Sequence, residues 1–253
     1  MTGRGSGAKA DVVPLTPVES PLPTTDGRLP GERGRQTRQR LLDATVELLS
    51  TTSWRSVKVT DIARRARTSP ATFYQYFGNV EQAIRVLAEG MVDQATELSE
   101  LALGGWSEQE SWDTALRITE GFLSYWETNR AVFRVVDLAT EEGDAQLRGI
   151  RVRALNAVTV ALAAVIAEGS PAGSDPMAVA GTLVAMFASV AAHRYGFEFW
   201  GIRTRNLVDT QARFLHWAVT GRPAPADVVG RSSLDTAAAR RAARARTGRA
   251  ARP

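Results

Sequence analysis

The amino-acid sequence predicts an all-α protein of about nine helices. From Arg35 onward, apolar residues recur at intervals of three or four, which is the period of a helix with one buried face. No stretch shows the strict apolar–polar alternation of a half-buried strand, and no repeat has the spacing of a solenoid. At 253 residues, the chain can bury a substantial core and form two modest domains.

Composition and periodicity divide the chain into four segments. Residues 1–32 are rich in proline and glycine and poor in apolar residues, so we expect a disordered N-terminal arm. Helical periodicity fills 33–80 and 81–220, which we expect to form two helical domains. In 221–253 the periodicity ends and arginines stand among alanines, which favours a disordered basic tail over one that folds on an anionic surface.

The expected helices follow from the spacing within each segment. Leucines at a helical period mark the first, and Trp54, Val57 and Val59 are expected to fill a small core behind it. Asn79 can cap a long helix that Gly104 ends. Outside the motif described next, helices are expected over 35–50, 80–103, 108–128, 130–140, 144–168, 176–200 and 206–219.

Residues 60–81 predict two short helices separated by a tight turn. Thr60 is a good N-cap for the first helix, and Arg67 and Thr68 break it. Ser69 can cap the second helix, and Pro70 at its first position loses no hydrogen bond there. This layout indicates a helix-turn-helix, whose second helix enters the major groove of DNA.

Within the second helix, Phe73 and Phe77 lie four residues apart and therefore share one face, which we assign to the core. Tyr74 and Gln75 point elsewhere.

The formal net charge of +4 conceals a partition between the two helical segments. Residues 33–80 carry nine basic and three acidic side chains, whereas residues 81–220 carry eleven basic and eighteen acidic ones. A cationic domain beside an anionic one fits DNA binding at one end only. Charge alone is equally compatible with a solvated surface, and the helix-turn-helix favours DNA.

The segment resembles the tetracycline-repressor (TetR) family of bacterial transcription regulators, and 35–50 resembles that family's first helix. The matching residues are Thr60, Ile62, Ala63, Ala66, Ser69, Thr72, Phe73, Tyr74, Tyr76, Phe77 and Glu81. Arg67, Ala71 and Val80 depart from the family pattern, which usually has glycine, often glycine, and usually lysine at these positions. The resemblance implies a dimeric, ligand-released repressor of a near-palindromic double-stranded DNA operator.

Mapped by the resemblance, four residues of the second helix would contact bases: Pro70, Ala71, Tyr74 and Gln75. Gln75 suits a bidentate pair with adenine, and Pro70 or Ala71 could touch a thymine methyl group. Residues expected to hold phosphates or reach the minor groove are Arg33, Arg35, Arg38, Arg55, Lys58, Thr60, Arg64, Arg65, Thr72 and Tyr76. The alternatives are that Tyr76 only packs the helix junction and that Arg65 is only solvated.

Aromatic residues are numerous in 81–220, and the resemblance implies a pocket there for a small apolar or amphipathic effector. The residues expected to line it are Trp112, Phe122, Trp126, Phe133, Met186 and Phe187. The alternative is that these side chains simply fill a core. No cofactor is expected.

Small residues four apart, Gly181, Ala185 and Ser189, form a row that allows two helices to approach closely. With Phe214, Leu215 and Trp217 they are expected to form a homodimer interface, as the resemblance also implies. The alternative is that the row packs only within one subunit.

Signals for an enzyme or a metal site are weak. The chain has no cysteine and two histidines, and it lacks an HExxH motif and a G-x-S-x-G elbow. The N-terminus has no apolar run typical of a signal peptide, and the uncharged stretch 177–192 is short for a membrane span, so we expect a cytoplasmic protein with no membrane partner. The alternative function is a helical small-molecule-binding or interaction protein whose helix-turn-helix is degenerate.

Overall fold

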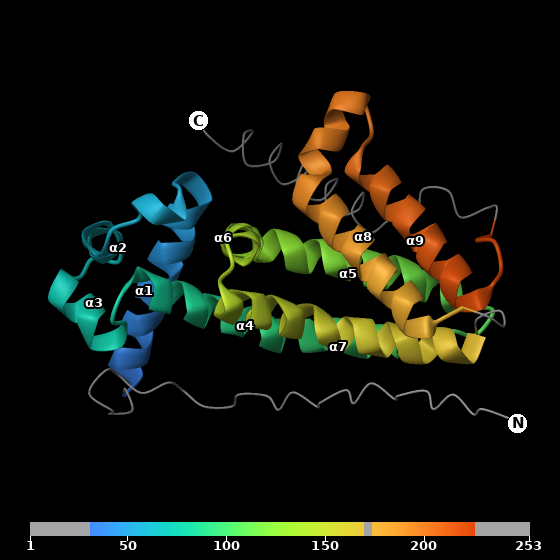
Figure 1. Cartoon of the computed structure of the whole chain (residues 1–253), viewed down its shortest axis with the longest axis horizontal. Helices are drawn as coiled ribbons and strands as arrows, with labels where there is room; N and C mark the ends of the chain where they lie inside the picture. Colours follow the sequence, from blue (N-terminus) through green and yellow to red (C-terminus); the bar gives the residue numbers. More distant parts are fainter. Residues whose placement is uncertain (1–30, 170–173, 226–253) are drawn as a thin grey trace, which may run out of the picture.

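The computed structural model describes residues 31–169 and 174–225 (Figure 1). Within these ranges the chain forms nine α-helices and two short 3-10 helices, η1 and η2, and no strand. The helices are α1 (Glu32–Thr51), η1 (Trp54–Ser56), α2 (Val59–Arg65), α3 (Pro70–Tyr76), α4 (Val80–Ala102), α5 (Ser111–Thr128), α6 (Arg130–Glu141), α7 (Ala145–Gly169), α8 (Pro176–Phe197), η2 (Glu198–Trp200) and α9 (Thr204–Thr220). The all-α class is therefore confirmed.

Helices α1, α2 and α3 gather at one end of the molecule around a small hydrophobic cluster (Figure 1). Leu41, Ile62, Phe73 and Phe77 are essentially inaccessible to solvent in it. Of the three residues expected to fill this core, Val57 is buried, and Trp54 and Val59 pack against it partly buried.

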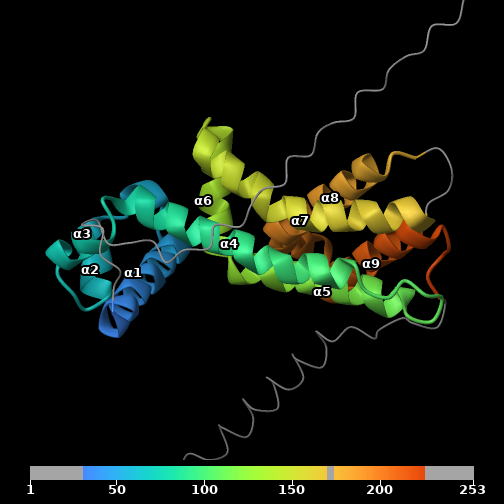
Figure 2. The ribbon, with the colours of Figure 1, turned by 90° about the horizontal axis from the view of Figure 1, so that it is seen from below.

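Helices α4 to α9 form the larger body of the molecule. α4 lies along α7, α5 along α9, and α7 against α8, and both views show α4 and α7 side by side (Figure 1, Figure 2). The core is rich in aromatic side chains: the rings of Trp126 and Phe133 stack with centroids 3.9 Å apart, and the hydroxyl of Tyr125 donates to the backbone oxygen of Met91 at 2.9 Å. These contacts fix α4, α5 and α6 to one another.

Helix α6 belongs to both hydrophobic clusters. Val135 is buried in the small cluster with residues of α1 to α4, while Phe133 and Val136 are buried in the large one. Because Val135 and Val136 are neighbours on an amphipathic helix, α6 cannot turn about its axis without disturbing one of the two cores. It lies where the two parts of the molecule meet (Figure 1, Figure 2).

Most expected helix boundaries agree with the structure to within three residues. The cap at Asn79 is confirmed, since its side chain accepts from the backbone N–H of Gln82 at 2.8 Å. The cap at Thr60 is wrong: α2 begins at Val59, because the backbone oxygen of Lys58 already accepts from the N–H of Ile62 at 3.1 Å. Helix α1 begins at Glu32, inside the segment expected to be an arm. The rest of that arm, and the tail from residue 226, lie outside the described residues.

Two helices, α7 and the segment Pro176–Trp200 that contains α8, are long and apolar enough by composition to cross a membrane. Both contribute buried residues to the large cluster, for example Leu162 and Phe187. Their apolar character is therefore accounted for by packing within the bundle.

The turn between α2 and α3 is closed by two backbone hydrogen bonds, from Thr68 N–H to Ala63 oxygen at 2.9 Å and from Arg67 N–H to Arg64 oxygen at 3.2 Å. This is the Schellman pattern, which requires a left-handed residue after the helix, and Arg67 has φ of 56°. The equivalent position after α6 is held by Gly143, with φ of 98°. Among the described residues, Arg67 is the only one other than glycine with a positive φ.

We expect Arg67→Gly to raise the free energy of unfolding by about 1 kcal/mol, because glycine adopts positive φ without the steric cost of a Cβ atom. Arg67→Ala is the matched control, since it removes the same charge but keeps the Cβ. Urea titrations of the three proteins would measure the difference. Equal stability of the glycine and alanine variants would contradict the idea that the turn is strained.

His216 ties the C-terminal end of α9 to the start of α5. Its Nε2 atom lies 3.2 Å from the Ser111 hydroxyl, and its Nδ1 atom lies 3.2 Å from the backbone oxygen of Arg222. Because that oxygen can only accept, Nδ1 carries the proton, and Nε2 accepts from the serine. Burial lowers the pKa of His216 below its ordinary value.

Since the folded protein disfavours the imidazolium form and the unfolded chain does not, His216 contributes stability above the unfolded pKa of about 6.5, and this contribution is lost as the pH falls below that value. We expect the midpoint of thermal unfolding to fall between about pH 7.5 and pH 5.5 more steeply in the wild type than in His216→Gln, which keeps an acceptor but does not titrate. Parallel slopes in the two proteins would refute the assignment.

Candidate functional site

The second helix of the motif, α3, is capped at its N-terminus and packs one face against the core. The Ser69 hydroxyl accepts from the backbone N–H of Thr72 at 3.1 Å, and Pro70 occupies the first position, as the sequence predicts. Phe73 and Phe77 are buried, with ring centroids 5.4 Å apart. The helix therefore has one buried face and one exposed face.

The four residues predicted to contact bases all lie on the exposed face. Pro70, Ala71, Tyr74 and Gln75 are exposed, and Tyr74 keeps 52% of its surface accessible. Tyr74 is therefore an exposed tyrosine on a helix whose other face packs in the core. The base contacts themselves stay predictions.

The residues predicted to hold phosphates divide by their partners. Arg35, Arg55, Arg64 and Arg65 pair with Glu32, Glu142, Asp61 and Glu47 respectively, all at the surface. Arg38 lies over the Phe77 ring, with 5.5 Å between the guanidinium carbon and the ring centroid. Arg33, Lys58 and Thr60 are exposed, and Thr72 and Tyr76 are half-buried at the start and end of α3.

Surface pairs of this kind contribute little to stability, about 0–1 kcal/mol each, so a phosphate can replace the carboxylate at small cost. Lys58 is exposed and forms no ion pair within the described residues. Lys58 and Arg33, which is also exposed without an ion pair among the described residues, are therefore the predicted phosphate contacts most readily available.

The aromatic residues predicted to line an effector pocket form the core instead. Phe122, Phe133 and Phe187 are at most 1% exposed, and Phe122 contacts both Trp126 and Phe187. Trp112 is buried under the guanidinium of Arg213 and next to His216. Met186 packs against the same core partly buried. Large apolar rings are buried in the core wherever it can enclose them. The sequence does not show which of them border a cavity instead.

A groove between α6, α7 and α8, with a cavity volume of about 1070 Å³, is lined by Trp126 from the predicted set. Its apolar floor consists of Trp126, Leu155, Val184 and Ala188. Charged side chains lie along its wall: Arg130, Arg134, Asp137, Glu141 and Arg151. The row Gly181, Ala185 and Ser189 borders it from α8. This combination of an apolar floor and a charged wall suits an amphipathic molecule.

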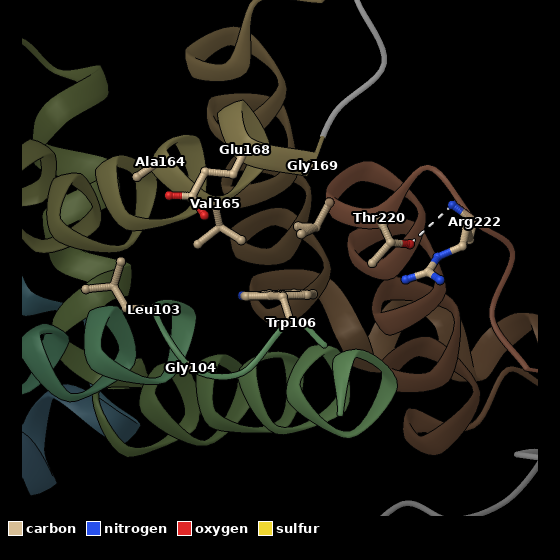
Figure 3. A pocket seen from close by; sticks show the side chains of 10 residues that line it. Leu103, Gly104, Trp106, Ala164, Val165, Glu168, Gly169, Thr220 and Arg222 are labelled. Carbon is tan, nitrogen blue, oxygen red and sulfur yellow. Dashed lines mark hydrogen bonds between the residues drawn. The ribbon is translucent and has the colours of Figure 1, made fainter. Parts of the chain in front are cut away.

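A second cavity of about 440 Å³ lies at the far end of the bundle (Figure 3). Leu103, Trp106, Val165 and Glu168 face it from one side, and Thr220 and Arg222 from the other (Figure 3). Two of its polar groups already have partners: the Trp106 ring N–H donates to the Ala102 oxygen at 2.9 Å, and Arg222 pairs with Glu108 at 3.1 Å. The groove is accordingly the better candidate for an effector.

The sequence reasoning missed Arg134 and Glu142, which join the two parts of the molecule. Arg134 donates to the backbone oxygens of Leu49 and Thr52 at the end of α1, and Glu142 pairs with Arg55 after it. A charged residue on an amphipathic helix signals only an exposed face, so no pattern could have named partners more than eighty residues away.

The predicted dimer residues separate into exposed and buried ones. Ala185 and Ser189 are exposed, Gly181 is half-buried, and Phe214 and Trp217 keep 50% and 62% of their surface accessible. Leu215 is fully buried within the subunit, and its assignment to the interface surface is wrong. An α-helix turns by about 100° per residue, so Leu215 faces into the core while Phe214 next to it stays exposed.

Two family models match the chain. A model described as bacterial regulatory proteins, tetR family, matches residues 41–86, and one described as tetracyclin repressor-like, C-terminal domain, matches residues 98–226, half of the chain. A search of curated proteins gives no match.

Solved structures share the fold at low identity. The fatty acid degradation regulator FadR from Bacillus halodurans has a TM-score of 0.58 at 15% identity, over 75% of this chain and 97% of that chain. A TetR-like transcriptional regulator from Rhodococcus sp. RHA1 has a TM-score of 0.57 at 20% identity, over 77% and 100%. The regulator FadR from Bacillus subtilis, in complex with stearoyl-CoA, has a TM-score of 0.55 at 18% identity, over 73% and 98%.

These structures show the fold alone, whereas the two family models cover both the recognition helix and the larger body of the bundle. The exposed face of α3 is where a regulator of this kind would read DNA. The chain belongs to the tetracycline-repressor (TetR) family and is a DNA-binding transcription regulator rather than an enzyme.

Proposed function

We propose that this chain is a cytoplasmic repressor that binds a near-palindromic operator as a homodimer and is released from it by a small amphipathic effector. The observation that carries the proposal is the exposed face of α3, held in place by the Ser69 cap and by buried Phe73. In this assignment 33–80 reads DNA, and 81–220 binds the effector and the second subunit.

On the DNA, Pro70, Ala71, Tyr74 and Gln75 contact base edges. Gln75 offers a donor and an acceptor to one adenine, and Tyr74 contributes a ring and a hydroxyl. Lys58, Thr60, Thr72, Tyr76 and the arginines Arg33, Arg35, Arg38, Arg55, Arg64 and Arg65 contact phosphates or the minor groove and fix the register.

In the dimer, the outer faces of α8 and α9 meet their symmetry mates. Exposed Phe214 and Trp217 on α9 and the small side chains of Ala185 and Ser189 on α8 would let the helices approach closely while burying aromatic surface. Two recognition helices then lie about 34 Å apart, which matches successive major grooves.

Release by the effector requires that it bind the DNA-free conformation more tightly. A molecule wedged in the groove would displace α6, which packs against α4, and α4 begins at Val80, directly after α3. A coupling of about 1–3 kcal/mol between the two sites is typical of such switches.

The alternative is a helical interaction protein whose motif no longer reads DNA. Arg67, Ala71 and Val80 favour it, because Arg67 strains the turn and Val80 cannot reach a phosphate. The Schellman hydrogen bonds and the Ser69 cap favour the first function, since both short helices keep their ends.

Titration of the purified protein with the DNA flanking its own gene tests the proposal, at two salt concentrations and with nonspecific competitor. We expect a discrete complex that survives the competitor and weakens steeply with salt, because phosphate contacts release counterions. Tyr74→Ala should abolish specific binding and leave the thermal midpoint nearly unchanged, since Tyr74 is half exposed.

Tyr74→Phe is the matched control, because it keeps the ring and removes only the hydroxyl. If Tyr74→Ala unfolds the protein, Tyr74 is a core residue and its assignment to DNA fails. Binding that the competitor erases would favour the degenerate motif.

Trp217→Glu tests the dimer. A carboxylate at the centre of an apolar contact costs about 3–5 kcal/mol, so the dimer should weaken by at least about 100-fold, as measured by sedimentation velocity. Leu103→Glu is the control, because Leu103 is also 62% exposed but lies at the end of α4. Dissociation of both variants, or of neither, would place the interface elsewhere.

A further inference from the structure

Arg134 occupies two sites at once. Its side chain belongs to the lining of the groove between α6, α7 and α8, and its guanidinium donates to the backbone oxygens of Leu49 and Thr52. Those oxygens belong to the C-terminal end of α1, where backbone acceptors have no partner within the helix and the helix dipole is negative. The last turn of α1 contains no basic residue of its own. Arg134 therefore supplies the positive charge that α1 lacks.

Among the cations of the groove, Arg134 is the one whose charge is not balanced by a carboxylate within the described residues. Arg151 pairs with Asp137 at 2.7 Å, and Arg130 lies 3.9 Å from Glu127 and over the Tyr195 ring. Arg134 contacts only neutral carbonyl oxygens. An anion in the groove would form a stronger, charge-assisted hydrogen bond with it than those carbonyls do.

Thr140 also lines the groove. Its hydroxyl oxygen is buried and has no hydrogen-bond partner within the described residues. A buried hydroxyl without a partner is costly, and a ligand oxygen or nitrogen would satisfy it. The floor below is apolar, formed by Trp126, Leu155 and Val184.

We infer that the effector is an amphipathic anion, an apolar chain with one carboxylate or phosphate, and that it acts by drawing Arg134 away from the end of α1. Its chain lies on the apolar floor and its head group binds the Arg134 guanidinium. Helix α1 then loses its compensating charge, and one of the contacts that hold α1 to α6 opens. This inference rests on the proposed function, because it names the effector of that regulator and the residue that transmits its binding.

Two measurements on the full chain test it. Tryptophan fluorescence, to which Trp126 in the groove contributes, reports binding of the probe, and fluorescence anisotropy of a labelled operator duplex reports binding of DNA. The probes are decanoate, decyl phosphate and neutral decanol, and the two anions distinguish a carboxylate head from a phosphate head. We expect at least one anion to bind about 10-fold more tightly than decanol and to weaken operator binding about 10-fold.

In Arg134→Gln the preference for the anion over decanol should disappear, and the operator affinity should no longer respond to either anion. Arg117→Gln is the matched control, since Arg117 is an exposed arginine of α5 outside the groove, and it should behave as the wild type does. Leu155→Trp fills the floor away from the α1 contact and should prevent all three probes from binding, which keeps the test decisive if Arg134→Gln does not fold.

Equal binding of decanol and both anions, an anion preference that survives in Arg134→Gln, or undiminished binding in Leu155→Trp would overturn the inference. An anion site that depends on Arg134 in a protein that binds no specific DNA would instead overturn the proposed function and leave the anion site standing. Operator binding that ignores an anion bound at Arg134 would overturn the role of Arg134 in transmission.

Discussion

Helix α6 must satisfy two hydrophobic clusters at the same time, and the relation between the two parts of the molecule depends on it. Val135 is buried with α1 to α4, while Phe133 and Val136 are buried among the aromatic residues of the larger body. Arg134, between them, reaches the end of α1. Because interiors are closely packed, such a helix has few positions available, and a shift of it must be felt on both sides.

The recognition helix illustrates how few residues are needed to present a reading surface. Phe73 and Phe77 anchor it, Ser69 caps its first turn, and Pro70, Ala71, Tyr74 and Gln75 are exposed. The turn before it keeps the Schellman hydrogen bonds even though Arg67 occupies the left-handed position. A strained residue is tolerated there because the buried anchors on both sides over-determine the turn.

The sequence predicted the local features well and the long-range ones poorly, for a physical reason. Caps at Ser69 and Asn79 depend on neighbours three residues away, so the pattern contains all the information needed. The predicted cap at Thr60 is wrong because the N-cap of α2 is Lys58, two residues earlier. Of the predicted effector residues, Trp126 lines the groove and the others pack in the core, because hydrophobicity marks a residue for burial without showing whether it ends in a core or at a cavity wall.

By itself, the sequence determined the all-α class, the helix order, the capped recognition helix and the cationic character of its domain, because each follows from periodicity, from short-range hydrogen bonds or from counted charge. Only the tertiary structure decided which aromatic residues fill the core, that Leu215 faces inward while Phe214 and Trp217 face outward, and that Arg134 meets the end of α1. These outcomes depend on contacts between residues distant in the chain, and the position of each helix relative to the others is set by packing that no single segment encodes.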